Sequence, residues 1–320
     1  MAVIDVIIPN LNGLENLKLV LNSLNNQTLR DFNIIVVDNG SSDGSVQYLE
    51  KNHKSVIIFK NETNLGFAKA INLGIKYSLN VTNPEIILLL NNDIELTDNF
   101  LENSVRTFNL NARADFLAVK MMNYHNRNVI DDTGDFIRSN GGTPMARGHG
   151  EKDIKKYDKT EFVFGACAGA AFYKTELFRQ AGLFDEDFFA YLEDVDLSFR
   201  LQLQGFKCYY NPEIICYHKR RETTRKFEGW ETYFTEKNIV TVRMKNYPFM
   251  LYLKYSPLFF LSRIKRFYKF FVNYPKGTFK AAVSGYLKGL SELPKSIKKR
   301  SAIQKSKTVS TKYIESLIIK

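Results

Sequence analysis

Five apolar residues, Ile86–Leu90, form a run without a polar break that ends abruptly on Asn91, Asn92 and Asp93. Such a run predicts a strand buried on both faces, which is typical of the middle of a parallel sheet. A strand in that position carries the residues after it to the carboxyl edge of the sheet, where open α/β folds bind ligands. The polar cluster is therefore a candidate binding site, although Asn and Asp are also ordinary turn residues.

Earlier segments repeat this pattern of a strand followed by polar residues. Three apolar runs predict strands, namely residues 3–9, 32–37 and 56–59. Helical spacing of the apolar residues between them predicts a helix after each strand, and Asn12 and Glu15 have the spacing of a capping box. This alternation predicts an α/β fold with a doubly wound, mostly parallel, Rossmann-like sheet. Asp38, Asn64 and Asp93 would then lie together at its carboxyl edge.

The pattern continues less regularly in the next part of the chain. Residues 98–110 predict a helix and residues 116–121 a strand, but from 123 to 159 no periodicity is visible. A stretch of that length inside a compact domain is usually a functional or a disordered loop. Residues 162–172 are apolar and rich in small side chains, which either let a ligand approach the backbone or allow tight strand packing.

Two further polar features follow predicted secondary structure. An acid-rich segment leads to Asp194 near the start of a helix, where acids are also common as caps that complement the helix dipole. A strand at 214–217 leads to His218. A single histidine is more often structural than a ligand, so neither feature identifies a site by itself.

Composition and charge restrict the class of protein. The 320 residues suffice for one large α/β domain with an appendage, or for two domains. Residues 39–44 are not a G-x-G-x-x-G fingerprint, and the chain has no Walker motif, which argues against a dinucleotide-binding oxidoreductase or a P-loop enzyme. The three cysteines, at 167, 208 and 216, have no metal-ligand spacing and suit a reducing cytosol.

The charge is distributed unevenly along the chain. Residues 1–218 hold 21 Lys and Arg against 28 Asp and Glu, a net −7, whereas residues 219–320 hold 24 against 6, a net +18. Two apolar segments near the start of this basic region, 248–253 and 257–261, are followed by lysines and arginines and are too short to span a bilayer. We expect the tail, residues 246–320, to dock on an anionic membrane surface, or alternatively to pack on the rest of the protein.

Several motifs, taken together and in order, resemble the family 2 glycosyltransferases of the GT-A fold, in the branch that contains rhamnosyltransferases. The motifs are Ile7–Pro9, Val36–Gly44, Asn64–Phe67, Leu89–Asp93, Gly165–Gly169, Tyr191–Asp196 and His218. The resemblance covers about residues 3–220. It implies a nucleotide-sugar glycosyltransferase domain over 1–220, with an acceptor-side loop at about 123–159, and a helical basic region over 221–320.

The resemblance also implies a role for individual residues. For donor binding these are Pro9, Asn10, Asp38, Asn64, Gly66, Lys69, Asn91 and Asn92. For acceptor binding they are Gly169, Glu193 and Asp196. Asp194 matches the catalytic base of an inverting displacement, and Asp93 and His218 would hold Mg²⁺ or Mn²⁺. Asn91 stands where the family's DxD motif has its first acid, so this site offers the metal one negative charge fewer.

The activity that the resemblance implies is transfer of a sugar, with inversion, from dTDP-rhamnose or a UDP-sugar to a glycan or lipid-linked acceptor. This suits the synthesis of cell-surface polysaccharide by a cytoplasmic enzyme that is peripheral on the inner face of the membrane, and a homodimer is possible. The alternative is a non-catalytic module of the same fold that binds nucleotide sugars or glycans. A nucleic-acid partner is suggested only by the basic tail, which has no recognition motif, and we expect none.

Overall fold

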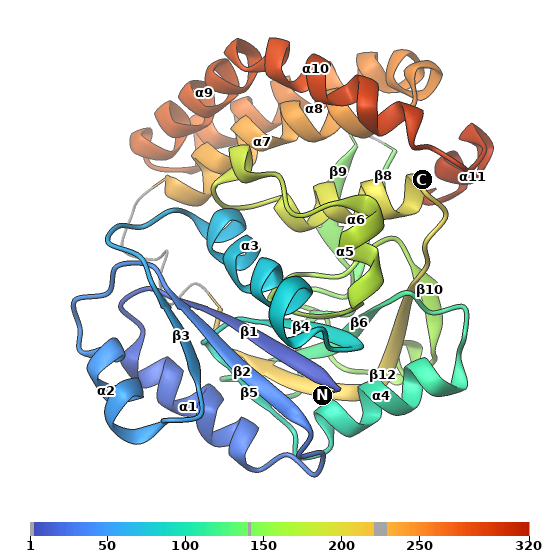
Figure 1. The fold of residues 1–320 in the computed structure, drawn as a ribbon. Helices are drawn as coiled ribbons and strands as arrows, with labels where there is room; N and C mark the ends of the chain where they lie inside the picture. Colours follow the sequence, from blue (N-terminus) through green and yellow to red (C-terminus); the bar gives the residue numbers. More distant parts are fainter. Residues whose placement is uncertain (1–2, 140–141, 221–228, 320) are drawn as a thin grey trace.

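The computed structural model describes residues 3–139, 142–220 and 229–319. Within them a sheet of ten strands forms the centre of the molecule (Figure 1), with the path β10-β12-β6-β11-β4-β1-β2-β3 and with β5 and β7 attached to β12 and β6. Its strands are β1 (Ile4–Asn10), β2 (Phe32–Asp38), β3 (Ile57–Lys60), β4 (Ile86–Leu90), β5 (Ile94–Leu96), β6 (Phe116–Asn123), β7 (Ile130–Asp132), β10 (Glu161–Val163), β11 (Ala170–Lys174) and β12 (Cys208–His218).

Strand β4 lies in the middle of the sheet, as its apolar run predicted. It pairs in parallel with β1 on one side and antiparallel with β11 on the other. Ile86, Leu88 and Leu90 point into one hydrophobic cluster, whereas Ile87 and Leu89 point into the cluster on the opposite face. Because both faces of the strand are covered, every position along it is apolar.

Helices cover both faces of the sheet, which makes the fold doubly wound. On one face lie α1 (Leu14–Asn25), α2 (Ser45–Asn52) and α4 (Phe100–Leu110). On the other lie α3 (Phe67–Tyr77), which continues as the short π-helix η1 (Ser78–Thr82), α5 (Thr175–Ala181) and α6 (Glu193–Leu203). The predicted α/β class and the mostly parallel sheet are confirmed, with the β1–β4 half parallel and β11 running against both of its neighbours.

The first helix does not begin with the predicted capping box. Its N-cap is Gly13, and the Leu14 N–H donates to Asp43 Oδ2 at 2.8 Å. Asn12 has a positive φ of 48°, and its side-chain oxygen accepts from Ser42 N at 2.8 Å. The cap therefore comes from the loop after β2, a contact that local sequence spacing does not show.

The stretch from 123 to 159 is not one long loop. It contains β7, β8 (Asp135–Arg138), β9 (Thr143–Ala146) and a 3₁₀ turn, η2 (Lys155–Tyr157). Strands β8 and β9 form a second sheet with β13 (Ile318–Ile319) from the end of the described chain. Strands of three or four residues are too short to give a clear apolar alternation, so the sequence did not predict them.

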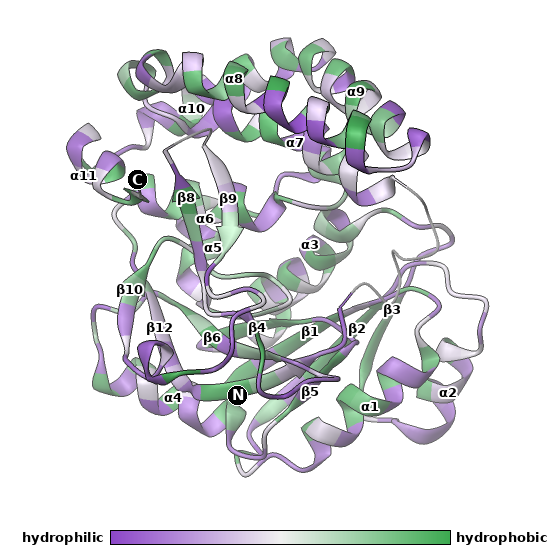
Figure 2. Ribbon diagram, turned by 180° about the vertical axis from the view of Figure 1, so that it is seen from behind, coloured by the Kyte–Doolittle hydropathy of each residue, from purple (hydrophilic) through white to green (hydrophobic). Residues whose placement is uncertain are grey.

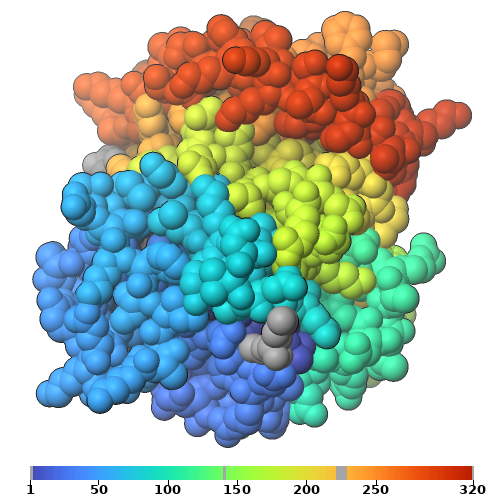
Figure 3. Space-filling view, in the orientation of Figure 1, coloured from blue at the N-terminus to red at the C-terminus, as the bar shows by residue number. Residues whose placement is uncertain are grey.

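The C-terminal part of the chain is helical, as expected. It consists of α7 (Trp230–Asn246), α8 (Phe249–Asn273), α9 (Lys276–Ser291), α10 (Leu293–Lys305) and α11 (Thr311–Ser316). Figure 3 shows α9 and α10 as an orange-to-red layer over the yellow-green region of α5 and α6. Phe199 of α6, Val242 of α7, Phe259 of α8 and Ile314 of α11 share one hydrophobic cluster, so this layer packs firmly on the rest of the protein. No helix in the described part of the chain is long and apolar enough to cross a membrane.

Candidate active site

A network of amides and one carboxylate joins the carboxyl ends of β1, β2 and β4. Asn10 Nδ2 donates to Asp38 Oδ2 at 3.0 Å, and Asn92 Nδ2 donates to Asn10 Oδ1 at 2.8 Å. The other Asp38 oxygen accepts from Ser41 N at 2.9 Å and from Gly40 N at 3.2 Å. These three residues, all predicted to bind the sugar donor, thus lie together and are buried. Their hydrogen bonds hold the loop after β2 beside β1 and β4.

A second group of predicted donor residues lies at the start of α3. Asn64 Oδ1 accepts from Gly66 N at 2.9 Å, and Asn39 Nδ2 donates to Asn64 Oδ1 at 3.3 Å. Gly66 has a φ of +83°, and a Cβ there would stand 2.6 Å from the Phe189 carbonyl oxygen, so only glycine fits. Lys69 lies exposed one turn further along α3. Pro9 is the penultimate residue of β1 and precedes the amide network.

Asp93 and His218 face each other because two strands are paired. Strand β5 runs antiparallel to β12 with Ile94 opposite His218, and the Lys219 N–H donates to the Asp93 carbonyl oxygen at 3.0 Å. Asp93 Oδ1 and His218 Nε2 are then 3.4 Å apart, and both residues are buried. The two predicted metal ligands are therefore neighbours.

A third residue, Asp131, fixes the imidazole of His218. Strand β6 lies between β7 and β12, and Asp131 Oδ2 is 2.7 Å from His218 Nδ1. Burial alone would lower the pKa of His218, but its hydrogen bonds with Asp131 and Asp93 outweigh burial and raise that pKa to about 9. Burial would raise the pKa of Asp131, but hydrogen bonds with His149 and His218 hold it well below its ordinary value.

Two basic residues complete the surroundings of Asp131. Arg220 Nη1 donates to Asp131 Oδ1 at 2.6 Å, and His149 Nδ1 is 2.9 Å from the Asp131 carbonyl oxygen. Arg220 has a positive φ of 56°, which turns the chain just after β12. Asp131, His149 and Arg220 were not predicted. Only the adjacent acids Asp131 and Asp132 could have signalled them, and no local pattern places those acids beside His218.

Asp194 lies in the first turn of α6, where its carboxylate is held by two backbone N–H groups. Asp194 Oδ2 accepts from Ala168 N at 3.2 Å, and Oδ1 accepts from Val195 N at 2.8 Å. Burial raises the pKa of Asp194 above its ordinary value, although these N–H groups oppose the shift. A carboxylate with a raised pKa, fixed in position but only half-buried, is suited to accept a proton.

Further buried carboxyl groups lie close enough to Asp194 to repel it electrostatically. Burial raises the pKa of Asp132 to about 7, with the nearby charges of Asp131 and Asp194 contributing. Burial, with repulsion from Asp132 and Asp194, likewise raises the pKa of Asp135 well above its ordinary value. Asp135 Oδ2 and Glu193 Oε2 are buried with no hydrogen-bond partner among the described residues. The site therefore gathers more carboxyl groups than was predicted, and burial favours the neutral form of Asp132 and Asp135.

The small residues after β10 bring this acidic region close to the end of β4. The Asn91 N–H donates to the Gly169 carbonyl oxygen at 2.7 Å. A Cβ on Gly169 would stand 3.5 Å from both Asn91 Nδ2 and Cys167 Sγ. Gly169, a predicted acceptor residue, thus lies against Asn91, a predicted donor residue.

Two predicted acceptor residues on α6 have different surroundings. The Glu193 carboxyl group is buried, and burial together with Asp194 raises its pKa well above the ordinary value. Asp196 is fully buried and makes ion pairs with Lys245 at 2.8 Å and Arg200 at 3.1 Å. These contacts give Asp196 a role in joining α6 to α7.

Asp93 and His218 are suited to bind a divalent cation whose remaining ligands come from a substrate and from water. Asp93 supplies a carboxylate oxygen and His218 an imidazole nitrogen, and Asp131 on the other ring nitrogen is the usual support of a metal-binding histidine. Among the described residues, no group of three or more His, Cys, Asp or Glu has metal-binding geometry. Two protein ligands are typical of sites in which phosphate oxygens and water complete the coordination.

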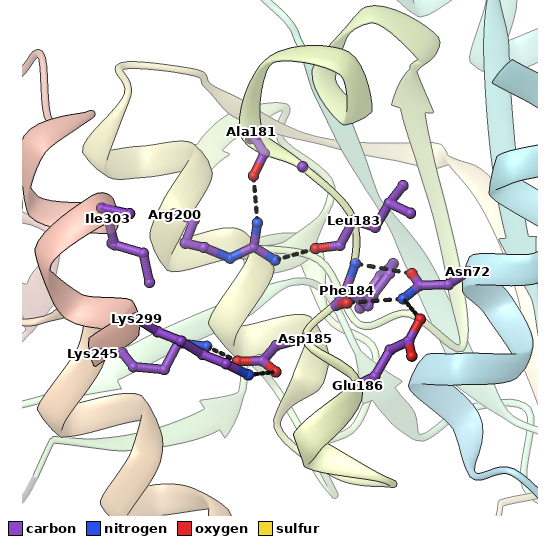
Figure 4. A pocket seen from close by; sticks show the side chains of 12 residues that line it. Asn72, Ala181, Leu183, Phe184, Asp185, Glu186, Arg200, Lys245, Lys299 and Ile303 are labelled. Carbon is purple, nitrogen blue, oxygen red and sulfur yellow. Dashed lines mark hydrogen bonds and ion pairs between the residues drawn. The ribbon is translucent and has the colours of Figure 1, made fainter. Parts of the chain in front are cut away.

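A separate pocket lies between the η3 turn (Glu186–Phe188) and the C-terminal helices (Figure 4). Asp185 pairs there with Lys245 and Lys299, and Asn72 on α3 exchanges hydrogen bonds of 2.9 and 3.0 Å with the backbone of Phe184. None of the predicted donor, acceptor or metal residues lines this pocket. Its polar groups are largely paired with one another, which indicates a structural junction.

Comparison with known proteins extends these observations. The family described as "Glycosyl transferase family 2" matches residues 5–180. A low-salt glycan biosynthesis hexosyltransferase of Haloferax volcanii is 24% identical over 208 residues, which are 64% of this chain and 64% of that protein. An N-acetylglucosaminyl-diphospho-decaprenol L-rhamnosyltransferase of Mycobacterium tuberculosis is 25% identical over 233 residues, 66% of this chain and 74% of that protein. The match with the archaeal relative thus spans less than two thirds of its length.

Solved structures share the fold over nearly the whole chain. S. aureus TarS 1–349 superposes with a TM-score of 0.58 at 16% identity, covering 96% of this chain and 91% of that one. A mannosyltransferase of Pyrobaculum calidifontis, in complex with GDP-Man and Mn²⁺, gives a TM-score of 0.52 at 14% identity, covering 98% and 78%. The fold is the GT-A fold of these glycosyltransferases. Because the family match covers more than half of its residues, this chain belongs to glycosyl transferase family 2.

Proposed function

We propose that this protein transfers a sugar from a nucleotide diphosphate to a hydroxyl group of a glycan or lipid-linked acceptor, with inversion at the anomeric carbon. The observation that carries the proposal is the grouping of three features in one region. These are the Asn10–Asp38–Asn92 network, the Asp93–His218 pair and the supported Asp194 carboxylate. We assign them the roles of donor site, diphosphate site and general base, as suits a chain that belongs to this family.

Asp194 would act as the base in a single displacement. The acceptor hydroxyl attacks the anomeric carbon while its proton passes to an Asp194 carboxylate oxygen, and the bond to the diphosphate oxygen breaks. The N–H groups of Ala168 and Val195 hold the carboxylate in place during this step. Its raised pKa makes it a stronger proton acceptor than an ordinary aspartate.

Asp93 and His218 would hold the diphosphate through a divalent ion, Mg²⁺ or Mn²⁺. When bound, such an ion neutralises the negative charge that develops on the leaving group. Asp131 keeps the His218 ring oriented through Nδ1, which leaves Nε2 beside Asp93 Oδ1 at 3.4 Å. The Asn10–Asp38–Asn92 network would place the nucleoside beside this point.

The names of the relatives and of the solved structures support a choice of donor and acceptor. The relatives include the rhamnosyltransferase named for N-acetylglucosaminyl-diphospho-decaprenol and a glucuronosyltransferase of Methanococcus voltae named for a dolichyl phosphate sugar. Solved structures of the same fold contain UDP, UDP-GlcNAc or GDP-Man. We propose dTDP-rhamnose or a UDP-sugar as the donor and a lipid-linked sugar as the acceptor, in synthesis of a cell-surface glycan. An enzyme of this kind would work on the inner face of the membrane.

A screen of nucleotide sugars tests the function. The purified protein is incubated with each nucleotide sugar and Mn²⁺ or Mg²⁺, with and without short lipid-linked acceptors, and the released nucleoside diphosphate is measured. We expect one donor to be turned over, turnover lowered by about 10²–10⁴-fold in Asp194→Asn, and no turnover in excess chelator. Donor binding by calorimetry without turnover under any condition would instead indicate a binding module.

A further inference from the structure

One helix of the C-terminal layer has two apolar faces. The inner face of α8 packs into the protein through Leu251, Tyr255, Phe259 and Phe270. Nine large apolar or aromatic side chains on the same helix are instead between 49% and 70% exposed, and the first of them, Phe249, begins the helix. We call the other eight the outer stripe: Met250, Leu253, Phe260, Leu261, Ile264, Tyr268, Phe271 and Val272.

The outer stripe is a continuous surface along one side of α8. Its members recur at intervals of three, four or seven residues, which keeps them on one side of a helix of ~3.6 residues per turn. The exposed Pro257 occupies the same side within the longest interval. Figure 2 shows α8 at the far end of the molecule from the main sheet, with apolar segments (green) along it. Exposed apolar surface of this extent usually marks an interaction site.

Lysines lie along one flank of the outer stripe. Helical geometry places Lys254, Lys265 and Lys269 on the same flank. Lys254 pairs with Glu315, but Lys265 and Lys269 are exposed and make no ion pair with any residue that the structure describes. Their long apolar stems can extend beside the outer stripe while their charges reach the solvent or an anionic headgroup.

The surrounding charge favours an anionic partner. Between Lys237 and Ile314 the sequence has one acid, Glu292, and that residue is already paired with Lys237 and Lys288. A symmetric contact with a second copy would bring the same lysines of both copies together, with no free acid from this region to oppose them. A bilayer with anionic headgroups offers both an apolar layer and negative charge.

We propose that the outer stripe of α8 inserts into the headgroup region of an anionic bilayer, with Lys265 and Lys269 contacting the headgroups. The inference rests on the proposed function, since a lipid-linked acceptor requires a membrane surface. It assigns the contact to the outer face of one helix whose inner face anchors it to the protein. The aromatic members Phe260, Tyr268 and Phe271 are the side-chain type that prefers this interface.

Flotation of the full chain with vesicles tests the inference without requiring catalysis. Vesicles of phosphatidylcholine are compared with vesicles that also contain phosphatidylglycerol, each at low and at high salt. We expect flotation only with phosphatidylglycerol, decreasing at high salt. Leu261→Gln with Ile264→Gln and Tyr268→Gln should abolish it, and Lys265→Glu with Lys269→Glu should lower the partition coefficient about tenfold or more. A chain that never floats overturns the inference.

Matched controls distinguish binding by the outer stripe of α8 from non-specific binding by exposed apolar residues or lysines elsewhere on the protein. Val81→Gln with Leu110→Gln replaces exposed apolar residues elsewhere, and Lys51→Glu with Lys54→Glu reverses two lysines near α2. Both should float like the wild type, and equal loss in a control would overturn the assignment to α8. Self-association that the triple variant abolishes would identify the outer stripe as an interface between copies instead. Without vesicles, all of these variants should turn over the soluble donor at the wild-type rate. If the wild type itself turns over no donor, the proposed function is refuted, whatever the flotation experiment shows.

Discussion

At the scale of single residues, Asp194 is the position where a change of one atom tests the chemistry. Asp194→Asn keeps the size of the side chain but removes the proton acceptor, so folding and donor binding should survive. A base contributes about 10²–10⁴-fold to the rate, and we expect kcat to fall by that factor. The thermal unfolding midpoint and the donor Kd are measured alongside. Glu193→Gln is the adjacent control, and a loss below about tenfold in Asp194→Asn would move the base elsewhere.

We expect Asp131 to affect metal binding through its contact with His218. Asp131→Asn removes the carboxylate that orients the ring at 2.7 Å and leaves an amide of similar shape. Loss of such a partner typically costs about 10–100-fold in metal affinity. Calorimetric titration of Mn²⁺ in the presence of a nucleoside diphosphate should show this weakening, and raising the metal concentration should restore much of the turnover.

Asp153 provides a matched control for the metal titration, because it is an aspartate of the same region with a different partner. It pairs with Lys120 at 2.7 Å and is not among the partners of His218. Asp153→Asn should therefore leave the Mn²⁺ affinity unchanged. If Asp131→Asn binds Mn²⁺ as tightly as the wild type, Asp131 has only a structural role.

The residue scale also shows where prediction from the sequence ends. Asp93, His218 and Asp194 could be proposed from the sequence because each follows a predicted strand or begins a predicted helix within a family motif. Asp131 and Arg220 were missed because their contact depends on the register of β7, β6 and β12. Register is a property of strand pairing, and no interval along the chain records it.

At the scale of elements, neighbouring phenylalanines on α8 provide a matched pair. Phe259 is 6% exposed and contacts the rings of Tyr247 and Tyr252, whereas Phe260 is 64% exposed. Phe259→Ala should lower the free energy of unfolding by about 3–5 kcal/mol, because it leaves a cavity in the cluster shared with α6. Phe260→Ala should change it by less than about 0.5 kcal/mol. Denaturant unfolding of the two variants measures both values, and similar losses would contradict the two-faced description of α8.

Elements with a strong apolar period could be predicted, and those without one could not. Strand β4 was expected from its apolar run and was found between β1 and β11. Strands β8 and β9 were missed because four residues are too few to show an apolar period, and β13, which completes their sheet, lies at the other end of the described chain. The capping box predicted for α1 was wrong for a similar reason, since the N–H group of Leu14 is capped by Asp43 from another loop.

At the scale of the whole molecule, Asp185 connects the sheet-bearing part to the C-terminal helices. It pairs with Lys245 of α7 and Lys299 of α10. Burial alone would raise the pKa of Asp185, but the two lysines hold it below its ordinary value. A lowered pKa means that the ion pairs stabilise the folded state above about pH 4, where the unfolded state is also ionised, and that this stability is lost as the pH falls further.

Asp185→Asn should therefore cost about 3 kcal/mol of unfolding free energy at neutral pH, because it removes one partner of a buried charge. Below about pH 4 the difference from the wild type should shrink. Thermal unfolding followed from about pH 7 to about pH 3 measures this, with Asp187→Asn as the more exposed control that also contacts Lys299. A difference that does not depend on pH would exclude the ion pairs as its cause.

The pairing of β13 with β8 has a consequence for the order in which the protein is made. Ile318 lies beside Ile137, so the second sheet and the cluster containing Ile314 can close only after the C-terminal helices have left the ribosome. Strand β7 with its acids directly precedes β8. Contacts between residues as distant in sequence as those of β8 and β13 form late in folding. Nascent chains stalled before residue 311 should therefore be cleaved by protease within β8 and β9, whereas released chains should be protected there. The second sheet would then be completed only once residues 311–319 have emerged from the ribosome.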